Sequence, residues 1–116
     1  SQKQMVRDRL QCLTEQLGGR VNVIGDYPAW EYLPESPLRE RMIEVYREQY
    51  GKEPVVETIH AGLECGIIGT NYPKLDMISF GPTICYPHSP DEKVNIASVG
   101  KFYEFLVDTL KNAPLK

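Results

Sequence analysis

The chain has 116 residues, of which 41% are hydrophobic and 25% are charged, and its formal net charge is −3. These proportions are close to those of an average globular protein and argue against an intrinsically disordered chain. Lysine and arginine are scattered without a basic stripe, and no apolar run approaches the roughly 20 residues that cross a bilayer. We therefore expect neither a nucleic-acid partner nor a membrane partner.

The first predicted element is an amphipathic helix over residues 4–17, which ends at Gly18 and Gly19. Its apolar stripe consists of Val6, Leu10, Leu13 and Leu17. Residues 20–27 alternate between apolar and polar side chains, which predicts an edge strand. The segment 27–37 has three prolines and no clear period, so we expect a connector between two structural units.

A second helix is predicted from Ser36-Pro37 to Gly51, because serine caps a helix and proline suits its first position. Its predicted apolar face consists of Leu38, Met42, Val45, Tyr46 and Gln49. Residues 55–62 (VVETIHAG) are typical of a strand, and residues 63–69 (LECGIIG) of a short helix or turn.

Residues 76–80 (DMISF) predict a short apolar strand, and the proline-rich residues 83–97 an irregular loop. A final helix is expected after Ser98, which would cap it. Its predicted apolar face consists of Phe102, Phe105, Leu106 and Leu110. The alternation of strands and helices indicates a layered α/β fold.

Two segments are hard to explain by packing alone. In the first, a predicted strand ends at His60, and Gly62 would let a ligand approach the backbone closely. The N–H groups at the N-terminus of the helix that follows would suit an anion or oxyanion. In the second, prolines flank His88 and would restrict a metal ligand or proton carrier, while Ser89, Asp91 or Glu92 could hold its ring or the loop. The alternative is a surface histidine at position 88 and a backbone-bonded histidine at position 60.

The chain does not hold a complete zinc centre. A catalytic zinc needs three protein ligands, and the sequence has two histidines and no H-E-x-x-H motif. Its three cysteines form no C-x-x-C motif, so we expect reduced thiols, a cytoplasmic location, and burial of Cys65 and Cys85 as small apolar groups.

The segments IHAGLECG, DMISFGP and HSPDE, in that order before a final helix, resemble the C-terminal region of aminoacyl-histidine dipeptidases. These enzymes belong to a wider family of di-zinc aminopeptidases, aminoacylases and carnosinases. The resemblance implies a layered α/β catalytic domain that binds two zinc ions, with an inserted lid domain that often dimerises. Residues 1–30 would then be the last helix and strand of the lid, and residues 31–116 the last part of the catalytic domain.

The resemblance also implies roles for individual residues. His88 would be a zinc ligand and Gly62 would contact the substrate, with His60, Glu64 and Ser89 in supporting places. The other ligands and the general base would lie upstream, so this chain alone would be inactive. The whole enzyme would hydrolyse Xaa-His dipeptides, and exposed sheet edges favour a homodimer. The alternative is a non-catalytic binding module with the same fold.

Overall fold

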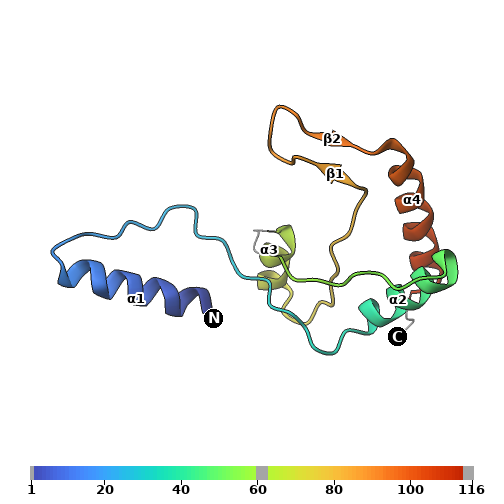
Figure 1. The fold of residues 1–116 in the computed structure, drawn as a ribbon. Helices are drawn as coiled ribbons and strands as arrows, with labels where there is room; N and C mark the ends of the chain where they lie inside the picture. The colour runs from blue at the N-terminus through green and yellow to red at the C-terminus, as the bar shows by residue number, and fades with distance from the viewer. Residues whose placement is uncertain (1, 60–62, 114–116) are drawn as a thin grey trace. The chain divides into compact units, whose positions relative to one another are not determined.

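The computed structural model describes residues 2–59 and 63–113. Within them, four helices and one two-stranded sheet follow the order α1 (Gln2–Gln16), α2 (Pro37–Tyr50), α3 (Glu64–Asn71), β1 (Ile84–Cys85), β2 (Lys93–Val94) and α4 (Ile96–Lys111) (Figure 1). The chain divides into two compact units. The first unit contains α1, the segment up to Tyr32 and α3, and the second, which begins at Leu33, contains α2, the sheet and α4.

Helix α1 confirms the first predicted helix. Gly18, with a φ of 80°, follows its C-terminus in the left-handed conformation that glycine adopts without strain. No residue of α1 is buried, and the four side chains of its apolar stripe are between 51% and 80% exposed. The stripe predicted from the spacing therefore exists, but no described residue covers it.

The strand predicted over residues 20–27 is wrong. A strand needs the backbone of a neighbour for its hydrogen bonds, and no described strand pairs with this segment. Side chains connect it to α1 instead, because Lys3 donates to Asp26 and to the carbonyl of Tyr27, and Arg7 lies 3.1 Å from Asp26. The hydrogen bond from Lys3 is the main reason why the pKa of Asp26 lies below its usual value.

Helix α3 confirms the short helix predicted at this place, and glycine brings it close to the connector. Gly66 is buried, and a Cβ atom built on it would lie 2.5 Å from the carbonyl oxygen of Pro28. Real Cβ atoms essentially never approach another atom so closely. Only glycine therefore fits where α3 meets the segment before the second unit.

The N-terminus of α2 is held by a network of hydrogen bonds. Ser36 accepts from the backbone N–H of Arg39, as predicted for a cap, and donates to a carboxylate oxygen of Asp76 at 2.7 Å. The other oxygen of Asp76 accepts from the N–H of Leu38 at 3.0 Å. The buried guanidinium of Arg39 donates to the carbonyl oxygens of Leu33 and Pro34. Asp76 thus stabilises a helix start.

Two further strand predictions are wrong among the described residues. Residues 76–80 form no strand, and neither do residues 55–59, the described part of the segment 55–62. The local pattern favours strands at both places, but the described chain offers neither segment a strand to pair with. The only sheet of the described chain is the antiparallel pair β1–β2, so a layered α/β sheet is not formed by these residues themselves.

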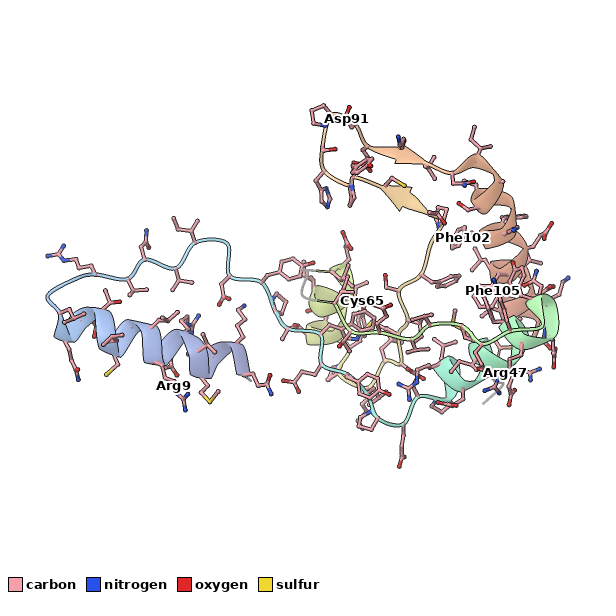
Figure 2. The ribbon with its side chains drawn as sticks, in the orientation of Figure 1. Arg9, Arg47, Cys65, Asp91, Phe102 and Phe105 are labelled. Carbon is pink, nitrogen blue, oxygen red and sulfur yellow. The ribbon has the colours of Figure 1, made fainter. Side chains whose placement is uncertain are left out.

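The second unit is built on the contact between α2 and α4. Met42 and Val45 of α2 are buried, as their predicted face requires. Phe105 of α4 packs edge-on against Tyr46 with ring centroids 5.5 Å apart, and Phe80 packs against both Phe102 and Phe105 (Figure 2). These aromatic contacts hold α2, α4 and the segment before β1 together.

The boundary and the face of α4 differ from the prediction. Asn95, and not Ser98, is the N-cap, and its side chain accepts from the N–H of Ser98. Both residue types cap helices well, so the sequence offered two starts three residues apart. Phe102, Phe105 and Leu106 are partly buried, as predicted, but Leu110 is 66% exposed and Thr109 is buried in its place. None of the helices in the described ranges is both long and apolar enough to cross a membrane.

Candidate functional site: the hairpin that presents His88

The segment predicted as an irregular loop contains a hairpin. Ile84 pairs with Val94, and Cys85 with Lys93, in an antiparallel register. Residues 86–92 form the connection between the strands, and Asp91 lies at the tip of the hairpin (Figure 2). Strands of two residues have too little periodicity to be recognised in the sequence, which explains the wrong prediction.

Ser98 attaches the base of the hairpin to α4. Its hydroxyl oxygen accepts from the N–H of Thr83 at 2.9 Å and donates to the carbonyl of Asn95 at 2.6 Å. The N–H of Asn95 donates to the carbonyl of Thr83 at 2.9 Å, which continues the ladder beyond β2. The hairpin therefore has a fixed connection to a helix that is itself packed against α2.

The tip of the hairpin has an unusual backbone. Tyr86 and His88 both have positive φ angles, 55° and 63°, and neither is glycine. The hydroxyl of Ser89 donates to the carbonyl of Tyr86 at 2.7 Å, and the N–H of His88 donates to a carboxylate oxygen of Glu92 at 2.9 Å. Such conformations are costly for residues other than glycine and persist only where surrounding bonds stabilise them.

The imidazole of His88 is available to a ligand. The residue is exposed, and its ring makes no hydrogen bond with any residue in the described ranges. A histidine with a free ring nitrogen on a restrained loop fits the role of one zinc ligand. Within residues 2–59 and 63–113, however, no group of three or more His, Cys, Asp or Glu side chains could hold a metal ion. This part of the chain thus fits one ligand of a metal site and not a whole site.

The other predicted site residues have different outcomes. His60 and Gly62 lie outside the described residues. Glu64 is the exposed first residue of α3, in the first unit, and the N-cap before it, Leu63, makes no side-chain hydrogen bond to the helix. Ser89 is next to His88, but its hydroxyl bonds to the loop backbone and not to the ring. The structure thus brings Ser89 and His88 together within one hairpin.

Three features near these residues were absent from the sequence-based prediction. The ring of Tyr27 lies beside Gly66 in the first turn of α3, and burial, followed by the nearby charges of Glu64 and Cys65, raises the pKa of this phenol. Ser98 was predicted to cap α4, but Asn95 is the cap, and Ser98 instead joins the hairpin to that helix. Cys85, in β1, is exposed and Cys65 is only partly buried, so the predicted burial of both is wrong. All three cysteines are free thiols.

Comparison with known proteins identifies relatives that share this chain's sequence and fold. The model of peptidase family M20/M25/M40 matches residues 19–112. Over all of its 116 residues the chain is 42% identical to the cytosol non-specific dipeptidase of Escherichia coli (strain K12). The matched region covers 24% of the length of that protein. It is also similar to the crystal structure of the aminoacylhistidine dipeptidase from Vibrio alginolyticus, with a TM-score of 0.82 and 42% identity over 97% of this chain and 23% of that one. The chain therefore spans about a quarter of the length of these relatives.

Proposed function

Because this chain belongs to peptidase family M20/M25/M40, we propose that it is the C-terminal portion of a zinc-dependent dipeptidase that hydrolyses Xaa-His dipeptides. The observation that supports this most directly is the exposed His88, whose ring bonds to none of the described residues and which lies on a hairpin tied to α4. The names of the two relatives support dipeptides as the substrate class, and one of them specifies an aminoacyl-histidine substrate.

In this proposal His88 supplies one zinc ligand. Its imidazole binds metal through a ring nitrogen. Zinc, when bound, lowers the pKa of a water molecule and polarises the scissile carbonyl. The hairpin contributes by holding the ligand in place, which lowers the ordering cost of binding. The remaining ligands and the general base belong to the upstream part of the enzyme, two zinc ions bind per subunit, and this chain alone is inactive.

The segment around Gly62, the first of the two singled out in the sequence, supplies the substrate side of the site. Gly62 lets the substrate approach the backbone closely, with His60 and Glu64 as neighbours, and Ser89 supports the zinc ligand from within the hairpin. Glu64 is exposed at the N-terminus of α3.

The remaining parts of the proposal concern the whole protein. Residues 1–30 belong to the lid domain and residues 31–116 to a layered α/β catalytic domain, whose upstream strands pair with segments that are unpaired here. The enzyme is cytoplasmic, as the name of its relative from Escherichia coli suggests, and forms a homodimer. The uncovered apolar stripe of α1 is consistent with a further contact of the lid.

The experiment compares the full-length protein with residues 1–116 alone in an assay of dipeptide hydrolysis. The full-length protein should cleave alanyl-histidine, lose activity when a chelator removes metal, and recover it with zinc, whereas the short chain should be inactive. Hydrolysis by the short chain, or by the metal-free full-length protein, contradicts the proposal. Equal cleavage of alanyl-alanine and alanyl-histidine contradicts the Xaa-His specificity alone.

A further inference from the structure

The carboxylate of Glu92 accepts a hydrogen bond from the backbone of His88 in the loop of the hairpin. We propose that Glu92 is a positioning residue for the metal site. Its carboxylate accepts the N–H of His88 and so keeps this residue in the left-handed conformation that directs the imidazole. This inference rests on the proposed function, since it concerns the residue assigned there as a zinc ligand.

The backbone of His88 determines where its ring can reach. At a φ of 63° the Cα–Cβ bond leaves the loop in a different direction from that of an ordinary extended or helical residue. Because that conformation is unfavourable without glycine, the loop would leave it unless a bond opposed the change. The bond that involves His88 itself is the 2.9 Å contact with Glu92, and a charged acceptor makes such a bond stronger than a neutral one.

None of the other polar side chains of the tip bonds to the backbone of His88 among the described residues. The hydroxyl of Ser89 donates to the carbonyl of Tyr86 and accepts from the N–H of Asp91. The N–H of Glu92 donates to the carbonyl of Ser89 at 3.1 Å, which closes a turn and brings the Glu92 side chain back towards His88. The carboxylate of Asp91 bonds with none of the described residues. Glu92 is therefore the acidic residue of this loop that acts on the histidine.

The sequence spacing explains why glutamate suits this position. His88 and Glu92 are four residues apart, and Pro87 and Pro90, which lack an N–H, limit the alternative hydrogen bonds of the loop. Partners of a metal-binding histidine more often bond to its second ring nitrogen. Here the partner bonds to the backbone, so both ring nitrogens remain available while the loop is restrained.

The test uses the full-length protein with three variants: Glu92→Ala, Glu92→Gln and Asp91→Ala. Zinc affinity is measured by competition with a chromogenic chelator, and the unfolding midpoint of the metal-free protein is measured in parallel. Glu92→Ala should weaken one of the two zinc sites by about tenfold, the lower end of the range for such partners. Glu92→Gln should stay within about twofold of the wild type, because its amide oxygen can accept the same bond.

The matched variants separate this role from charge and from stability. Asp91→Ala removes an equal charge from the neighbouring position and should leave zinc affinity unchanged. The unfolding midpoint of the metal-free Glu92→Ala protein should equal that of the wild type. Wild-type affinity in Glu92→Ala overturns the inference, as does an equal loss in Glu92→Gln or in Asp91→Ala.

A His88→Ala variant separates a failure of the proposed function from a failure of the positioning role of Glu92. If it retains both zinc sites, the proposed function is wrong and the inference falls with it. If it loses one site while Glu92→Ala keeps both, only the positioning role of Glu92 is wrong.

Discussion

The close approach between α3 and the connector makes Gly66 sensitive to the addition of a single methyl group. In Gly66→Ala the new Cβ would lie 2.5 Å from the carbonyl oxygen of Pro28, a backbone atom that cannot rotate away. Overpacking of this kind costs about 1–3 kcal/mol, and a contact this short favours the upper part of that range. Alanine gains about 1 kcal/mol over glycine in a helix. The net expectation is a local destabilisation of about 1–2 kcal/mol.

Amide hydrogen exchange measures this local cost in the full-length protein. A loss of about 1–2 kcal/mol corresponds to exchange that is roughly 5–30-fold faster in α3. Gly100→Ala is the matched control, since Gly100 lies within α4 and nothing stands within 4 Å of its added Cβ. That variant should slow exchange in α4. Unchanged or slower exchange of α3 in Gly66→Ala would refute the packing argument.

Two further predictions concern the ends of α2 and α1. Asp76→Ala removes the acceptor for the hydroxyl of Ser36 and the N–H of Leu38, so amide hydrogen exchange in the first turn of α2 should become faster by the equivalent of about 1–2 kcal/mol. The control Asp91→Ala should leave exchange in that turn unchanged. Unchanged exchange there in Asp76→Ala would contradict the role of Asp76. Lys3→Ala should raise the lowered pKa of Asp26 towards its ordinary value, as followed by carboxyl NMR titration. Because the folded pKa is depressed, the stabilisation from this pair is present above the ordinary aspartate pKa and is lost as pH falls through the folded value. A titration identical to that of the wild type would show that Lys3 does not act on Asp26.

The helices could be predicted because their signals are local. The spacing of apolar residues and the residues at the ends were enough to predict α1 and α2, whereas α3 was predicted only as a short helix or turn. The start of α4 was placed too late because Asn95 and Ser98 are both good caps, and only the hydrogen bonds show which one begins the helix. A side chain that lies far along the chain, such as Asp76 at the start of α2, gives no local signal.

The strands could not be predicted in the same way, because a strand depends on its neighbour. Residues 20–27 and 76–80 have strand-like patterns, and yet the described chain has no strand beside either of them. The hairpin β1–β2 formed where the pattern was weakest, since Thr83, Asn95 and Ser98 close its base through backbone and hydroxyl bonds. Whether a segment formed a strand therefore depended on a neighbouring strand to pair with and not on the strand propensity of its own residues.

The candidate site could be predicted in part. The prolines on both sides of His88 indicated a restrained histidine, and the structure shows such a loop with the ring exposed. The sequence did not show that the restraint includes positive φ angles at Tyr86 and His88, or which of three nearby polar residues bonds to the histidine backbone. His60 and Gly62 lie outside the described residues, so their roles stay predictions.

The zinc content of His88→Ala in the full-length protein tests the central claim most directly. Metal content would be measured by elemental analysis after dialysis, with His88→Asn beside it because asparagine tolerates the left-handed backbone at this position. If His88 is a zinc ligand, both variants should hold one zinc ion per subunit where the wild type holds two, and both should lose most of their turnover. Two zinc ions and full turnover in both variants would contradict the assignment.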